Sequence, residues 1–240
     1  PVISARGGTA VMVKATYITI DGLEITNPNG LIGINVIPAQ AGANKNITIS
    51  NCYIHDINYT NEAEFTYERS GGIIVYADGI EPVWFENMVV TNNVIEKTSR
   101  MGILYTTQWA YRPGRWGKNT DGTKYAYKND NENWFVFLNS SISNNTLTDI
   151  RGDGIMAAGA KGLVIEKNVV YNAYSTEKNG SSSAAAGLWT TNTNDSIIQY
   201  NEVGYTKLPA GGTDGDGYDI DISEVNTTLQ YNYSHNNAGG

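Results

Sequence analysis

The chain has 240 residues, only 17% of them charged, and its formal net charge at pH 7 is −8. Phosphate binding needs clustered positive charge, and no basic patch is visible, so nucleic acid is not expected as a partner. No apolar stretch is long enough for a transmembrane helix. Length predicts one extended domain over residues 1–240, and the lack of recognisable caps suggests a fragment of a longer chain.

A short motif recurs along the chain: an apolar residue, two variable residues, a polar residue that is usually Asn, one more residue, and an apolar residue. Asn tolerates the left-handed dihedrals of a sharp bend, and stacked Asn side chains can hydrogen-bond from copy to copy. These Asn residues are therefore expected to be structural. The copies are Ile49–Ile54, Val90–Ile95, Ile142–Leu147, Ile165–Val170, Ile198–Val203 and Leu229–Ser234, with a looser first copy at Ile20–Ile25.

A second short segment follows each motif and begins with Gly. Both kinds of segment are short, β-branched and alternating, and no helical periodicity lies between them. The pattern predicts an all-β parallel β-helix of about seven coils with loop insertions. The second segments are Gly33–Val36, Gly72–Val75, Gly102–Tyr105, Gly154–Ala157, Gly187–Thr190 and Gly217–Asp221.

Strand alternation predicts which side chains of the second segments face outward. If the residue after Gly points into the solenoid, the next one points out. This outward face changes from apolar to acidic toward the C-terminal end. The first outward column is Asn35, Ile74, Leu104, Met156, Trp189 and Asp219, and the next includes Tyr76, Thr106, Thr191 and Asp221.

The longest insertion runs from about Tyr105 to Phe137 and is rich in aromatic residues. Long loops in compact domains are often functional, and aromatic rings offer flat faces on which sugar rings can stack. Trp109 and Trp116 are the best candidates for such a platform. The alternative is that these rings only pack the loop onto the solenoid. Cys52 occupies a motif position and is expected to be a core residue.

Four carboxylates lie within Asp214–Asp221. Asp219 and Asp221 are expected on one face, about 7 Å apart by strand rise. Asp214 in the preceding turn could fold back toward Asp221. Glycosidases use a carboxylate pair at the scissile bond, and clustering raises the pKa of one member, as an acid catalyst requires.

Asp153 is predicted to lie in register with Asp216, about 10 Å away by two inter-strand spacings, with Arg151 in the same turn. The acidic cluster has two further interpretations. It could bind calcium, although its spacing does not fit an EF-hand loop. It could also be a set of solvated turn residues at strand edges.

The coil pattern resembles the pectin-lyase-like right-handed parallel β-helix family over essentially the full length. The stretches Ile197–Val203, Asp214–Asp221 and Gln230–Gly240 are more similar to secreted bacterial β-helix glycosidases, a group that includes lacto-N-biosidases, which cut a disaccharide from glycans. The resemblance implies that two aspartates seven residues apart, here Asp214 and Asp221, act as acid/base and nucleophile.

The resulting hypothesis is a secreted bacterial enzyme, extracellular or on the cell surface, that hydrolyses a glycosidic bond in an oligo- or polysaccharide. Asp219 and Asp153 would tune the catalytic pKa values or bind sugar hydroxyls. Trp189, Tyr218 and Trp109 would stack on sugar, and Trp116 and Arg151 are further candidates for substrate binding. No cofactor is expected unless calcium binds, and nothing in the sequence specifies an oligomeric state.

Two alternatives stay open. A calcium-dependent polysaccharide lyase would need a base, and the acidic strand contains no Lys or Arg; Arg112, Arg115 and Arg151 are the nearest candidates. A non-catalytic glycan-binding solenoid would use the aromatic loop alone, with the aspartates only capping turns.

Overall fold

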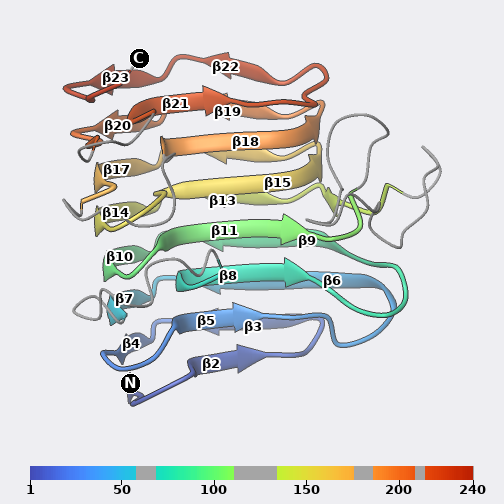
Figure 1. Ribbon diagram of the computed structural model, residues 1–240. Coiled ribbons are helices and arrows are strands. Elements are labelled where there is room, and N and C mark those ends of the chain that lie inside the picture. Colours follow the sequence, from blue (N-terminus) through green and yellow to red (C-terminus); the bar gives the residue numbers. More distant parts are fainter. Residues whose placement is uncertain (58–68, 111–133, 176–185, 209–213, 240) are drawn as a thin grey trace, which may run out of the picture.

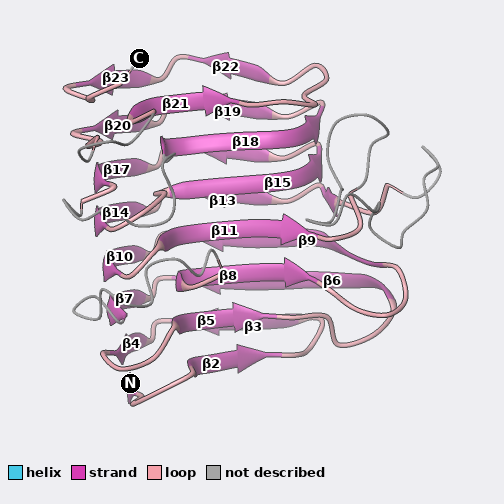
Figure 2. Cartoon of the chain, in the orientation of Figure 1, coloured by secondary structure: helices cyan, strands magenta, loops and turns pink. Residues whose placement is uncertain are grey.

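The computed structural model describes residues 1–57, 69–110, 134–175, 186–208 and 214–239. This part of the chain consists of short strands and contains no helix, as Figure 2 shows. All the strand pairs are parallel, and successive coils stack from the N-terminus to the C-terminus (Figure 1). The prediction of an all-β fold with parallel stacked strands is confirmed.

The strands fall into three stacks that run along the molecule. The first is β1-β4-β7-β10-β14-β17-β20-β23, the second β2-β5-β8-β11-β15-β18-β21, and the third β3-β6-β9-β13-β16-β19-β22; β12 pairs with β9 and β15 and so joins the second and third. Their bounds are β1 Val2–Ser4, β2 Thr9–Val13, β3 Ile18–Asp21, β4 Glu24–Asn27, β5 Ile32–Val36, β6 Gly42–Ser50, β7 Tyr53–Ile57, β8 Gly71–Ala77, β9 Val83–Thr91, β10 Val94–Thr98, β11 Met101–Thr107, β12 Phe137–Leu138, β13 Ser141–Ser143, β14 Thr146–Ile150, β15 Ile155–Lys161, β16 Val164–Glu166, β17 Val169–Ala173, β18 Ala186–Asn194, β19 Ile197–Gln199, β20 Glu202–Gly204, β21 Asp216–Ile220, β22 Thr228–Gln230 and β23 Tyr233–His235.

The core is a narrow column of aliphatic side chains between the three stacks. Each strand contributes its inward positions, so one apolar residue is stacked on the equivalent residue of the next coil. Cys52 belongs to this core, as predicted: it is 2% exposed and burial raises the pKa of its thiol. The fully buried members of the first stack include Ile25, Ile54, Ile95, Leu147, Val170 and Val203.

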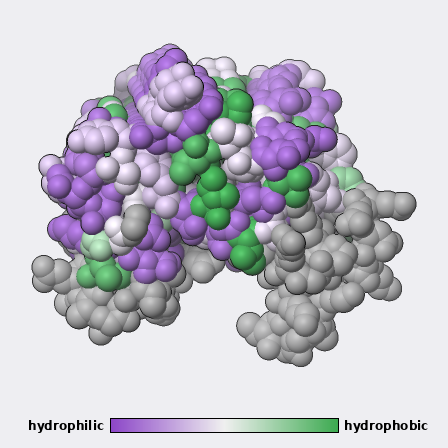
Figure 3. Space-filling model, turned by 90° about the horizontal axis from the view of Figure 1, so that it is seen from above, coloured by the Kyte–Doolittle hydropathy of each residue, from purple (hydrophilic) through white to green (hydrophobic). Residues whose placement is uncertain are grey.

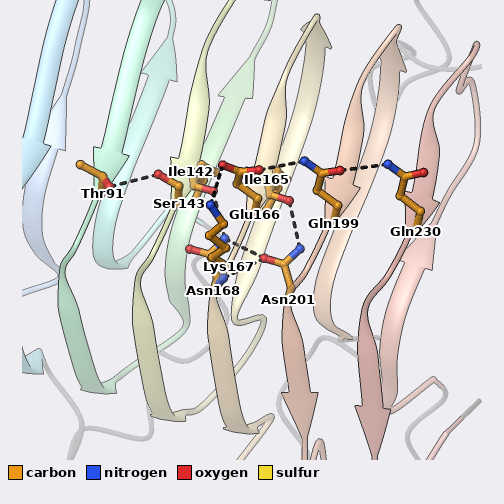
Figure 4. A network of polar contacts seen from close by, with 10 residues as sticks. All are labelled: Thr91, Ile142, Ser143, Ile165, Glu166, Lys167, Asn168, Gln199, Asn201 and Gln230. Carbon is orange, nitrogen blue, oxygen red and sulfur yellow. Dashed lines mark hydrogen bonds and ion pairs between the residues drawn. The ribbon is translucent and has the colours of Figure 1, made fainter.

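The predicted Asn ladder is present. Asn145 shows the repeating unit: its Nδ2 donates to Asn168 Oδ1 at 2.9 Å, and its Oδ1 accepts from Asn93 Nδ2 at 2.9 Å. Asn201 and Asn232 continue the ladder at 2.9 and 3.0 Å. Figure 4 shows part of it beside a second, outer row of polar side chains formed by Thr91, Ser143, Glu166, Gln199 and Gln230.

One detail of the ladder prediction was wrong. The left-handed residue of each bend is not the ladder Asn but the residue before it, because the ladder side chain must turn inward to reach its neighbour. That preceding position has φ of 53–56° at Asn51, Asn92, Asn144, Lys167, Tyr200 and Tyr231. The bend therefore accepts Lys and Tyr as well as Asn.

The glycines that open the second segments are required by close approach between coils. A Cβ on Gly102 would lie 2.4 Å from the carbonyl oxygen of Gly154 and 2.4 Å from Leu147 Cδ2. Gly154 stands in the same relation to Gly187 and Val170, again at 2.4 Å. Any side chain here would force the first and second stacks apart.

The predicted outward column is confirmed by the pairing register. Asn35 pairs with Ile74, Ile74 with Leu104, Leu104 with Met156, Met156 with Trp189, and Trp189 with Asp219. Its apolar part is buried all the same: Ile74 is 1% and Leu104 2% exposed, in a small second cluster with Ile32 and Met101 on the outer side of the sheet. The other members of the column, Asn35, Met156, Trp189 and Asp219, are partly exposed.

Candidate active site

The acidic turn before β21 is held in a strained conformation. Asp214 and Gly215 both have positive φ, 70° and 83°. Gly215 is buried, and a Cβ there would lie 3.1 Å from Leu208 Cβ. The Gly239 amide donates to the Gly215 carbonyl at 2.9 Å and so ties the turn to the last coil. Asp214 is an exposed residue at the start of the acidic face, but its carboxyl is partly withdrawn from solvent.

The carboxylates of this face influence one another. Burial and the neighbouring charges of Asp216, Asp153 and Asp221, in that order, raise the pKa of Asp214. Burial raises the pKa of the half-buried Asp219, and the charge of Asp221 is the next largest cause. Like charges close together disfavour ionisation, so Asp214 and Asp219 each hold a proton to higher pH than a solvated carboxyl does.

Trp189 on β18 lies beside this face, and its indole is held by a hydrogen bond to the buried residue Asp153. Its indole Nε1 donates to Asp153 Oδ1 at 2.9 Å, and the backbone amide of Ala186 donates to the same oxygen at 3.1 Å. The other oxygen of Asp153 pairs with Arg100 Nη1 at 2.6 Å. Asp153 is 0% and Arg100 3% exposed, so a fully buried ion pair supports a half-buried ring.

The predicted register of Asp153 is confirmed. The Gly154 amide donates to the carbonyl of Ala186, and Ala186 pairs with Asp216, which places Asp153 two strands from Asp216. The Arg100 side chain crosses Gly152 to reach Asp153: a Cβ on Gly152 would lie 1.9 Å from Arg100 Nη1. Four successive coils thus contribute to one site.

No family model matches the chain. A lacto-N-biosidase from Bifidobacterium longum subsp. longum is 25% identical over 288 aligned positions, which include 96% of this chain and 17% of that protein. The crystal structures of a GH136 lacto-N-biosidase from Eubacterium ramulus, a native and a selenomethionine form, match with TM-score 0.73 over 98% of this chain and 40% of theirs, at 26% and 25% identity. The chain is similar to lacto-N-biosidases. It spans less than half the length of these relatives.

The likeness to lacto-N-biosidases supports the resemblance that the Asp214–Asp221 motif carried. Asp214 lies in the turn before β21, Asp216 and Asp219 lie on β21, and Asp221 follows the strand directly. Among the described residues, no group of three or more His, Cys, Asp or Glu side chains could hold a metal ion.

Two predicted stacking residues were assigned wrongly. Trp109 is 4% exposed and packs edge-on against Phe135, with centroids 6.4 Å apart. The chain after β11 folds directly onto Gly159, where a Cβ would lie 2.6 Å from Ala110 Cβ, and this buries Trp109. It is a core residue and offers no face to a sugar.

Tyr218 also packs inward. It pairs with the core residue Leu188, and its hydroxyl donates to the Tyr233 carbonyl at 3.3 Å. Burial raises the pKa of its phenol. The alternation rule already placed it inward, directly after Gly217, so the stacking assignment contradicted the strand pattern.

Trp116 lies outside the described residues. Arg151 is half-buried in the turn between β14 and β15, where its amide donates to the Thr98 carbonyl at 3.1 Å.

Sequence reasoning missed Arg100, although it stands just before a buried strand, where a cation needs a partner. No helix within the described ranges is long and apolar enough to cross a membrane.

Proposed function

We propose that this chain is the site-bearing part of a secreted bacterial glycoside hydrolase, with Asp214 as acid/base and Asp221 as nucleophile. The observation that carries the proposal is the cluster of four aspartates at and around β21, with Asp219 in register with Trp189. Burial and the neighbouring charges raise the pKa of Asp214 in this cluster. The likeness to lacto-N-biosidases supports a glycan as substrate. The resemblance carried by the Asp214–Asp221 motif implies a neutral or amino-sugar glycan from which a disaccharide is released. We further propose that the stack winds as a right-handed coil of about seven turns.

In this mechanism the two carboxyls have different roles. Asp214 stays protonated to higher pH than an ordinary carboxyl and donates its proton to the leaving oxygen. Asp221 attacks the anomeric carbon and forms a glycosyl ester. Asp214, now a base, then activates the water that hydrolyses the ester, so the anomeric configuration is retained. Trp189 offers its ring to the apolar face of the sugar.

Asp219 has a different role from the catalytic pair. It faces the same side as Trp189, with which it pairs in register, and its carboxyl is half-buried. Its raised pKa suits a group that hydrogen-bonds a sugar hydroxyl, either as donor or as acceptor. Asp153 has no exposed surface, so it acts on the substrate only through Trp189 and through its charge.

The test uses the complete protein that carries this chain and a panel of glycans, with products read by mass. Asp221→Asn is expected to lower kcat at least about 10³-fold while the circular dichroism spectrum and Tm stay those of the wild type. A 2-fluoro glycosyl donor should label a peptide that contains Asp221. An Asp221→Asn protein of wild-type activity would refute the assignment, as would an unsaturated product, which marks a lyase.

A further inference from the structure

The ion pair behind Trp189 is buried in a solenoid whose core is otherwise mostly aliphatic, and its burial costs desolvation free energy. Removing two opposite charges from water costs several kcal/mol each, and packed apolar side chains of similar volume usually stabilise a fold at least as well. Arg100 and Asp153 nevertheless occupy the corner between the first and second stacks, 2.6 Å apart and almost without exposed surface. Stability alone does not account for them.

The geometry of Asp153 indicates what the pair does. One carboxylate oxygen is occupied by the Arg100 guanidinium, and the other accepts from Trp189 Nε1 and Ala186 N. With both oxygens engaged, the carboxylate has a fixed orientation. The indole is thereby held at one edge while its ring lies beside Asp219, the register partner of Trp189.

Arg100 is 3% exposed, and its guanidinium pairs with Asp153. Its side chain reaches Asp153 only because Gly152 leaves the space above it free. The pair therefore joins three coils: Arg100 precedes β11, Asp153 precedes β15 and Trp189 lies on β18. A shift of any one of these coils would move the ring relative to the acidic strand β21.

We propose that Arg100 is a positioning residue that acts through Asp153 to hold the Trp189 ring as the sugar platform of the site. The inference rests on the proposed function, since it names how the same site binds its substrate. The platform is preorganised, so substrate binding does not have to order the indole. Loss of the pair weakens binding, whereas the acid and the nucleophile stay in place.

The molecule contains a matched control. Trp84 Nε1 donates to Glu86 Oε1 at 2.8 Å, and Glu86 pairs with Lys45 Nζ at 2.7 Å. This group has the same chemistry of cation, carboxylate and indole, but it lies on β6 and β9 in the third stack and is partly exposed. Substitutions there report the general effect of breaking such a triad without touching the site.

The main experiment compares Arg100→Met, Arg100→Lys and Lys45→Met in the complete protein, with kcat and KM measured on one glycan. Arg100→Met should raise KM about tenfold or more and change kcat less than about threefold, the pattern of lost uniform binding. Arg100→Lys should recover most of the affinity, and Lys45→Met should behave as the wild type. A normal KM in Arg100→Met, or equal losses in the Met and Lys variants, would overturn the proposal.

Arg100→Met leaves a buried charge unpaired and could fail to fold, so a second variant removes both charges. Arg100→Met/Asp153→Asn keeps an amide oxygen for the indole and for Ala186. Its KM should stay closer to that of the wild type than the KM of Trp189→Phe, which keeps a ring but lacks the donor. If the double variant and Trp189→Phe bind substrate equally, the hydrogen bond does not position the ring.

A spectroscopic measurement separates this inference from the proposed function. In protein labelled with 5-fluorotryptophan, the fluorine resonance lost in Trp189→Phe identifies that ring, and Trp84→Phe identifies the control ring. The Trp189 resonance should shift or broaden in Arg100→Met and not in Lys45→Met, whether or not any glycan is cleaved. An unchanged Trp189 resonance in Arg100→Met would refute the positioning role. A protein that cleaves no glycan of the panel would refute only the proposed function.

Discussion

At the scale of one residue, Asp219 lowers the free energy of unfolding of the protein when its carboxyl is ionised. Its pKa in the folded protein is raised above the ordinary 3.8, first by burial and then by the charge of Asp221. The folded state therefore binds more protons than the unfolded state above that pH. Stability contributed by this group falls as pH rises from 3.8 through the raised value, because the carboxylate must ionise in unfavourable surroundings.

The prediction that follows is a stabilising substitution. Asp219→Asn should raise Tm at pH 7 and have no such effect near pH 3, where the aspartate is protonated in both states. The check is thermal unfolding of both proteins across this pH range. Asp78→Asn, on an exposed loop of another coil, serves as the surface control. A gain in Tm that is the same at every pH would point to packing instead.

Under the proposed mechanism, Asp214 governs the pH dependence of catalysis. Its raised pKa keeps the acid form present to higher pH, so the falling limb of kcat/KM should lie above the ordinary carboxyl range. Because the charge of Asp153 contributes to this shift, Asp153→Asn should move that limb to lower pH. The measurement is kcat/KM against pH for both proteins, and a limb that moves upward would contradict the assignment.

The sequence located these residues well where a local rule applied. Strand alternation placed Trp189 and Asp219 in one column, and the coil repeat placed Asp153 in register with Asp216. It failed where the result depended on how the chain folds back after a strand. Trp109 was assigned to the surface, because nothing local shows that the chain beyond β11 covers Gly159.

At the scale of the element, the Asn ladder defines each bend. The Asn145 side chain makes four hydrogen bonds: it donates to Asn168 Oδ1 and to the Val90 carbonyl, and its oxygen accepts both the amide and the side chain of Asn93. It is 1% exposed, so none of these groups can be satisfied by water if the side chain is lost. Asn144, the left-handed residue before it, is not part of this ladder of buried side-chain hydrogen bonds.

Neighbouring substitutions should thus have opposite outcomes. Asn145→Ala is expected to cost about 2–4 kcal/mol, because several buried donors and acceptors lose their partners. Asn144→Gly should be close to neutral, since its φ of 55° suits glycine. Urea unfolding of the two variants gives the comparison. Equal losses would mean that the bend and not the ladder limits stability.

The ladder was predicted from sequence because Asn recurs at one motif position, and the repeat was sufficient to identify its partners. The exact residue in the left-handed conformation was not, because Lys167, Tyr200 and Tyr231 hold φ near 55° without the usual sequence signal. Their backbone is imposed by the stacked coils on either side. Tertiary constraint here overrides local preference.

For the whole molecule, stability is a chain of contacts between neighbouring coils. Each interior strand of the first stack pairs only with the strand before and the strand after it. Figure 3 looks onto the C-terminal end of the stack, where apolar side chains lie among polar ones. The large apolar side chains exposed at this end are Ile220, Ile222, Val225, Leu229, Tyr231 and Tyr233.

Hydrogen exchange should follow this arrangement. In this chain, amides of β10 and β14 are expected to exchange slowest and those of β1 and β23 fastest, since the end strands have only one neighbour. Native-state exchange read by mass spectrometry tests the gradient. Uniform protection along the stack would show that the coils unfold as one unit.

The glycine corners have a consequence for how such a protein can change over time. Glycines one coil apart meet backbone to backbone, so the spacing of the rungs is set by the main chain and hardly by the loops between them. A flexible loop can double in length for about 0.6 kcal/mol. Insertions at the rim can therefore lengthen, shorten or exchange while Arg100, Asp153, Trp189 and Asp219 keep their mutual positions. If the chain acts on glycans as proposed, such insertions would change which glycan is admitted and leave the geometry of the site unchanged.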